Sequence, residues 1–224
     1  MALLGAVFGA MILIGFRRTP VPDPPPRAAL AETGLPPAYW AYWALVSAVI
    51  SFEFCALFWA PAFLEQSVGL SRGAAAASAA VFSLGMLVGR VAASRLVRRF
   101  APTQLLLAAL SLAVAGFFVY WGSGWPAAAV FGLFLLGLGT APLYPLSLSL
   151  AVSAAGIQRD AASARVTLAV GLAILFVPTA LGALADEVGL HRAYLMLPGL
   201  VVAALVGLTV ARTLQGTRLY WVRR

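Results

Sequence analysis

Glu53 is the residue whose type and surroundings point most directly to chemistry. It lies a little beyond the middle of a long apolar stretch that covers residues 39–62. A charged carboxylate near the centre of a bilayer costs about 2.5–3.5 kcal/mol, so such a residue usually faces a bundle interior, a partner or water. Burial favours the neutral carboxyl, which would let Glu53 take up and release a proton. A hydrogen-bonded structural glutamate is the alternative.

The helical neighbours of Glu53 indicate that it faces the inside of a bundle. At helical spacing its face is shared with Val46, Val49, Ala56 and Ala60, which are mostly small. Small side chains leave room for a polar group between packed helices, so we expect an interior position.

A second candidate is a stripe of hydroxyl groups further along the chain. Thr140, Tyr144 and Ser147 recur at positions i, i+4 and i+7, which places them on one helix face. The stripe predicts a cavity wall that offers hydroxyls to a polar solute. Hydroxyls that bond back to their own helix are an equally ordinary outcome.

Glycines at regular spacing predict close helix packing. Gly85 and Gly89 form a small-residue pair that lets two backbones approach, and Arg90 follows directly. Glycine and proline are also frequent between residues 132 and 145. A bendable helix beside a cavity would explain this, because irregular backbone is tolerated there and not against lipid. Simple packing is the alternative.

The residue types required by common enzymes are missing from the sequence. The single histidine, His191, lies next to Arg192 in a predicted outer loop, and the single cysteine, Cys55, excludes an internal disulfide. Neither a nucleophile-elbow motif nor a phosphate-binding glycine loop occurs. We therefore expect no enzyme activity, no cofactor and no metal site.

The composition identifies a membrane protein. Of the 224 residues, 62% are apolar and 10% are charged, whereas a soluble domain has roughly 25% charged residues. The mean hydropathy is +0.97. The net charge of +8 comes from arginines placed between apolar runs, without a basic face for nucleic acid. These arginines fit topology signals and contacts with membrane lipids.

Six apolar segments are long enough to cross a bilayer as helices, which needs about 20 residues each. They cover residues 39–62, 74–96, 103–121, 126–152, 162–185 and 193–211. A seventh segment, residues 2–16, is shorter and is followed by Arg17 and Arg18, which is the wrong charge order for a signal peptide. The fold class is therefore an all-α membrane bundle of six helices with one truncated helix before it.

The arginines also predict an orientation. A proline-rich linker covers residues 17–38, and if successive segments cross the membrane in alternate directions, thirteen arginines fall on the side of this linker and two on the other. Arginines accumulate on the cytoplasmic side. We therefore place the linker in the cytoplasm, together with the C-terminal tail of the unit 39–224. The membrane is expected to be the cell (inner) membrane.

Three stretches resemble the major facilitator superfamily. Residues 85–90 (GMLVGR) and 95–100 (RLVRRF) resemble the second copy of its cytoplasmic loop motif, although Ser94, Arg98 and Ala101 stand where the family often has Gly, an acid and Gly. Residues 137–145 and 178–186 resemble the tenth and eleventh helices of sugar-permease-like members. The position of Glu53 before Trp59 and Pro61 is similar to the seventh helix of that branch.

The resemblance implies a C-terminal six-helix half. Residues 1–16 would be the remnant of the last helix of a missing N-terminal half, which is then the expected partner. The family works by alternating access about a central substrate site between the halves. Glu53 would couple protons or bind the substrate, residues Thr140, Tyr144 and Ser147 would line the cavity, and Gly85, Gly89 and Arg90 would form a cytoplasmic gating motif.

Two other functions remain open at this point. A multidrug efflux member of the same family would suit an acid that lies among aromatic side chains. A truncated half that does not transport, and instead binds another membrane protein, is the third possibility. The small-molecule substrate, the coupling ion and the transport direction are not specified by the sequence.

The arginine distribution makes a labelling prediction. In a Cys55→Ala background, Gly124→Cys should be labelled by a membrane-impermeant thiol reagent added to intact cells, and Ala101→Cys should be spared, because the two positions are predicted to lie on opposite sides. Labelling of position 101 alone would show that the chain has the opposite orientation. Equal labelling of both positions would contradict the predicted number of membrane segments.

Overall fold

The computed structural model describes residues 34–222 of the chain, with side chains described to residue 215. Every regular element in this range is a helix. The elements are α3 (Pro37–Gln66), α4 (Arg72–Leu96), α5 (Pro102–Gly122), α6 (Pro126–Thr140), α7 (Leu143–Ala154), α8 (Arg159–Val188), α9 (Leu190–Ala193) and α10 (Met196–Val222). The segment 2–16 and most of the linker 17–38 lie outside the described residues, as does Arg224 at the end of the tail.

Six membrane-length spans confirm the predicted fold class. Four are the single helices α3, α4, α5 and α8, the fifth combines α6 and α7 over Pro126–Ala154, and the sixth combines α9 with α10 over Leu190–Gln215. Each predicted segment lies inside one of these spans. A helix that crosses the hydrocarbon pairs its backbone groups within itself and exposes apolar side chains to lipid. Each span therefore appears in the sequence as one contiguous apolar run, which is why segment length predicts it.

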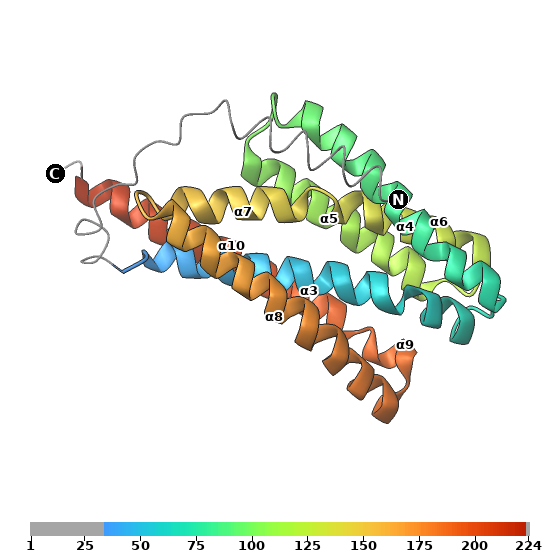
Figure 1. The fold of residues 1–224 in the computed structure, drawn as a ribbon. Helices are drawn as coiled ribbons and strands as arrows, with labels where there is room; N and C mark the ends of the chain where they lie inside the picture. The colour runs from blue at the N-terminus through green and yellow to red at the C-terminus, as the bar shows by residue number, and fades with distance from the viewer. Residues whose placement is uncertain (1–33, 223–224) are drawn as a thin grey trace, which may run out of the picture. The chain divides into compact units, whose positions relative to one another are not determined.

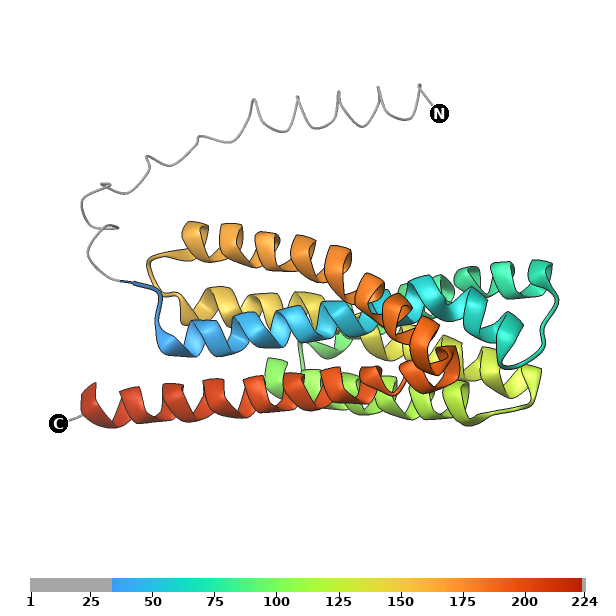
Figure 2. The same ribbon diagram turned by 90° about the horizontal axis from the view of Figure 1, so that it is seen from below.

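Successive spans run back and forth along one bundle (Figures 1 and 2). The start of α3, the turn between α7 and α8 and the end of α10 lie at one end, and the turns after α3 and α5 lie at the other. The predicted division of the arginines therefore follows the two ends of the bundle for the described residues. Arg72 is the first residue of α4, after the turn that follows α3, whereas Arg159 is the first residue of α8, after the turn that follows α7.

Helix α3 occupies the centre of the bundle. It packs against α10, α8, α7 and α4, and its span is the most buried of the six. Its largest fully buried side chains include Tyr39, Tyr42, Phe52 and Phe63. A helix enclosed in this way can carry a polar side chain without exposing it to lipid.

The span formed by α6 and α7, the fourth along the chain, is broken where the prolines predicted irregular backbone. Helix α6 ends at Thr140, a turn contains Ala141 and Pro142, and α7 begins at Leu143. Pro142 has no amide hydrogen to continue the helical pattern, and the helix resumes with a hydrogen bond from the Leu146 amide to the Pro142 carbonyl of 3.1 Å.

Glycines bring α4 and α5 into backbone contact with α6. A Cβ at Gly85 would overlap the carbonyl of Phe134, and one at Gly89 would overlap the carbonyl of Leu138. On the opposite side, a Cβ at Gly116 of α5 would overlap the amide of Leu136. The small-residue spacing predicted from the sequence thus packs α4 directly on α6.

Replacing one of these glycines should destabilise the fold. We expect Gly85→Ala to lower the free energy of unfolding by about 1–3 kcal/mol, because its methyl group would meet backbone atoms that cannot move aside. The matched control is Gly171→Ala in α8, where an added Cβ meets nothing within 4 Å. Denaturant unfolding of the detergent-purified chain, followed by tryptophan fluorescence, measures both. Equal stability of the two variants would contradict the close contact.

Candidate functional site

Glu53 lies at the middle of α3 and is buried, with 8% of its surface exposed. The residues that share its helix face are almost fully enclosed: Val46, Ala56 and Ala60 are 0% exposed and Val49 is 2% exposed. The interior position expected from the sequence is therefore confirmed. Glu53 therefore lies on the enclosed face of the central helix of the bundle.

Arg90 of α4 lies within electrostatic range of Glu53, across the contact between α3 and α4. Within residues 34–215 the ion pair is the one between Glu65 and Arg72 at 4.0 Å, so Glu53 and Arg90 are further apart than an ion pair. Coulomb attraction at such range is effective where little water screens it. The structure thus brings together two residues to which the sequence assigned separate roles.

The hydroxyl stripe is divided by the structure. Thr140 and Ser147 are 0% exposed. The Thr140 hydroxyl donates to the Gly137 carbonyl at 3.0 Å, and the Ser147 hydroxyl donates to the Leu143 carbonyl at 2.7 Å. Tyr144 is half-buried, so its ring reaches the accessible surface. Of the three residues, Tyr144 is the one whose side chain is accessible.

Arg90 borders a shallow groove of about 240 Å³ on the surface of the bundle. The groove lies between α4 and the start of α7, and its wall includes Ala93 and Val97 of α4 with Pro142 and Pro145. Gly85 and Gly89 lie beneath this surface in the contact with α6. The two glycines of the predicted gating motif therefore hold α4 in place, and the arginine projects from it.

Hydrogen bonds that the sequence did not indicate join α3 to α8. The Tyr39 hydroxyl donates to the Ala162 carbonyl at 2.9 Å, and the Trp43 indole donates to the Arg165 carbonyl at 3.1 Å. Near the other end of the bundle, the indole of Trp59 donates to the Pro178 carbonyl at 2.9 Å. Aromatic residues near both ends of α3 were the available signal, because Tyr and Trp seek hydrogen-bond partners when buried.

A wide groove of about 650 Å³ lies next to the Trp59 contact. It runs between α3 and α8, and its wall contains the aromatic rings of Phe58 and Trp59 together with Thr179 and Asp186. Phe58 is 53% exposed. The structure places the Asp186 carboxylate in the same groove wall as these two aromatic rings.

Comparison with known proteins identifies the fold. The sequence matches the family model described as Major Facilitator Superfamily over residues 1–156 and again over residues 42–219. A search of curated proteins found no match.

Two solved transporters are similar to this chain. FucP, a Major Facilitator Superfamily transporter in the outward conformation, aligns with a TM-score of 0.77 and 18% identity, over 96% of this chain and 53% of its own. A bacterial homolog to the human lysosomal transporter Spinster, inward-facing and unoccupied, aligns with a TM-score of 0.49 and 19% identity, over 94% of this chain and 53% of its own. This chain spans about half the length of both transporters.

The different exposure of Tyr144 and Ser147 predicts that a thiol reagent reaches these two positions at different rates. In a Cys55→Ala background, Tyr144→Cys should react with a small water-soluble thiol reagent in detergent, whereas Ser147→Cys should react at least roughly tenfold more slowly, because position 147 is fully enclosed. Mass spectrometry of the labelled chain measures both rates. Faster labelling of position 147 would mean that the face of α7 is turned the other way.

Proposed function

This chain belongs to the Major Facilitator Superfamily, and on that premise we propose that it is the C-terminal six-helix bundle of a secondary transporter that moves a small polar solute by alternating access. The chain is a multi-pass membrane protein of a transporter family, not an enzyme. Residues 42–156 match the family model twice, as expected of a fold built from two similar six-helix repeats.

The observation that carries the proposal is the enclosed carboxyl of Glu53 in the central helix. Glu53 is buried in α3, and Arg90 lies on the neighbouring helix α4. An ionisable residue inside a membrane bundle is a common element of proton pathways. In the proposal the proton is held at Glu53 in one state of the transporter and released in another.

Solute binding is assigned to the accessible part of the hydroxyl stripe. Tyr144 can offer its phenol hydroxyl at the surface of the bundle, and the break at Pro142 lies just before it. Thr140 and Ser147 support this position by holding the helix on either side of the break. In the proposal they shape the cavity wall, and Tyr144 contacts the solute.

A complementary bundle completes the proposed transporter. The chain covers 53% of FucP, and alternating access needs two bundles that move about a shared site. The second bundle would come from another part of a longer chain or from a separate chain. The arginine-rich end of this bundle would face the cytoplasm, and the membrane would be the inner membrane of the cell.

Efflux of amphipathic drugs is the second candidate, and the groove next to Trp59 favours it. Two aromatic rings and the Asp186 carboxylate border a space of about 650 Å³. Aromatic faces and a carboxylate both attract an organic cation. This function would use the end of the bundle that holds Asp186, whereas the main proposal uses Glu53.

Neutralising Glu53 tests the main proposal. With the bundle reconstituted in liposomes beside its complementary half, Glu53→Gln should reduce solute-driven proton flux by more than about tenfold, because an amide cannot release a proton. A pH-sensitive dye inside the liposomes reports the flux for a panel of sugars, organic acids and cationic drugs. The matched control is Glu65→Gln on the same helix, whose carboxylate is exposed and paired with Arg72.

The outcomes separate the candidates. Loss of flux in Glu53→Gln with normal flux in Glu65→Gln supports coupling at Glu53. Flux at the normal rate in both variants over several pH values makes Glu53 a structural residue. Flux that appears with cationic drugs alone and is lost in Asp186→Asn would replace the main proposal by the efflux function. The absence of transport for the whole panel, with either half alone or with both, would favour a bundle that binds another membrane protein.

A further inference from the structure

A concentrated positive patch lies at the end of α4, where the chain turns into α5. Arg95, Arg98 and Arg99 border a hollow of about 680 Å³ together with Ser94 and Leu96. All three arginines are exposed, and within the described residues none forms an ion pair closer than 4.0 Å. Three unpaired guanidinium groups within five residues form a site that attracts a phosphate.

The start of α5 adds to this positive potential. The helix begins at Pro102, two residues after the turn, and its amide groups point back toward the turn. A helix N-terminus carries roughly half a positive charge. The arginines and the helix dipole therefore act on the same small region.

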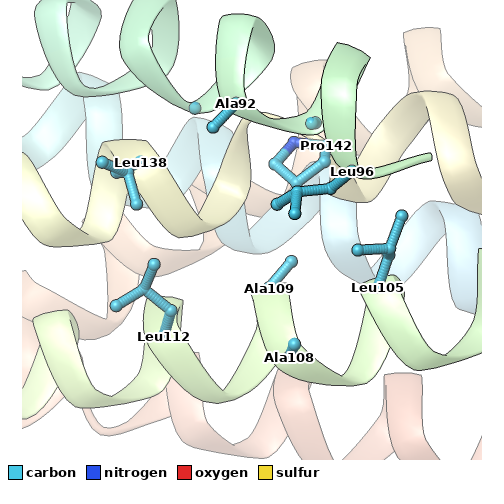
Figure 3. Close-up of a pocket in the computed structure, with 10 residues that line it drawn as sticks. Ala92, Leu96, Leu105, Ala108, Ala109, Leu112, Leu138 and Pro142 are labelled. Carbon is cyan, nitrogen blue, oxygen red and sulfur yellow. The ribbon is translucent and has the colours of Figure 1, made fainter. Parts of the chain in front are cut away.

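An apolar cavity lies between α4 and α5 (Figure 3). Helices α4 and α5 each pack on α6 but hardly touch one another, and the cavity fills the space between them. Its volume is about 150 Å³, and an apolar cavity of about that size can hold a molecule such as benzene. It therefore has room for a short stretch of acyl chain. Its wall includes Ala92 and Leu96 of α4, Ala108 and Leu112 of α5, and Leu138 and Pro142 beneath them.

Leu96 belongs to the walls of both spaces, so the positive hollow and the apolar cavity adjoin. Helix α4 has 25 residues and is roughly 37 Å long, which exceeds a hydrocarbon core of about 30 Å. Arg95, near its last residue, therefore lies at the headgroup level. Val97 and Phe100 in the same turn are 48% and 49% exposed, as suits side chains that lie in the membrane interface.

We propose that this region binds one anionic phospholipid, with its phosphate at Arg95, Arg98 and Arg99 and the upper part of one acyl chain in the cavity between α4 and α5. A soluble anion would satisfy the arginines and leave the cavity unused. A neutral lipid would fill the cavity and leave three positive charges unmatched. An anionic phospholipid is the ligand that complements both parts, and it would link α4 and α5 where they do not contact each other.

Native mass spectrometry of the detergent-purified full chain tests the proposal. The chain is titrated with phosphatidylglycerol and with phosphatidylcholine of the same acyl chains. We expect phosphatidylglycerol to bind more tightly, and Arg98→Gln combined with Arg99→Gln to weaken it by roughly 25-fold, since each arginine near an anionic surface contributes about fivefold. Binding of phosphatidylcholine should not change in that variant. Arg192→Gln, at the opposite end of the bundle, is the matched charge control.

A second variant tests the cavity. Ala108→Phe should fill it and weaken both lipids, whereas Ala77→Phe, an exposed position near the other end of α4, should behave as the unchanged chain. Size-exclusion profiles and tryptophan fluorescence establish that each variant is folded before it is compared. Unchanged phosphatidylglycerol binding in the double arginine variant would overturn the proposal. So would full displacement of the lipid by glycerol phosphate, or a loss of binding in the arginine variant without any loss in Ala108→Phe.

Discussion

The arrangement of this bundle depends on backbone contact between α6 and its two neighbours. Lipid surrounds the helices with material as apolar as their own side chains, so association depends on close packing and not on the hydrophobic effect. Gly137 of α6 lies against the Phe82 backbone of α4, while Gly132 and Gly139 lie against the backbone of α5. Because these glycines face two directions, α6 holds α4 and α5 on different sides of itself. The separation between α4 and α5, and the apolar cavity within it, follow from that geometry.

The same contact determines where Arg90 can reach. Gly89 presses α4 onto Leu138, and the next residue, Arg90, lies about 100° further around the helix, where it borders the groove between α4 and α7. A shift of α4 along α6 would move the guanidinium relative to the carboxyl. In the proposed transporter, the apolar contact between α4 and α6 therefore controls the electrostatic interaction between Arg90 and Glu53.

Helix α3 connects this arrangement to the other side of the molecule. Its tyrosine and tryptophan side chains donate to three carbonyls of α8, at positions that are well separated along the helix. At the end of the bundle near Trp59, Gly182 of α8 leaves space for the indole ring itself. In surroundings with little water such bonds are not exchanged for bonds to solvent, so α3 and α8 should move together. This coupling suits a bundle that moves as one body during alternating access, with Glu53 held in its central helix.

The sequence by itself determined the class of the protein, the six spans, their bounds to within a few residues and the enclosed position of Glu53. These properties are local, because a span is a contiguous apolar run and a helix face repeats at a known period. The tertiary structure decided which residues meet. It enclosed Thr140 and Ser147 with their hydroxyls turned to their own helix, left Tyr144 accessible, brought Arg90 within electrostatic range of Glu53, and placed the arginines of the α4–α5 turn beside an apolar cavity. None of these follows from periodicity, since lipid-facing and protein-facing surfaces of a membrane helix are both apolar and the pattern does not distinguish one neighbour from another.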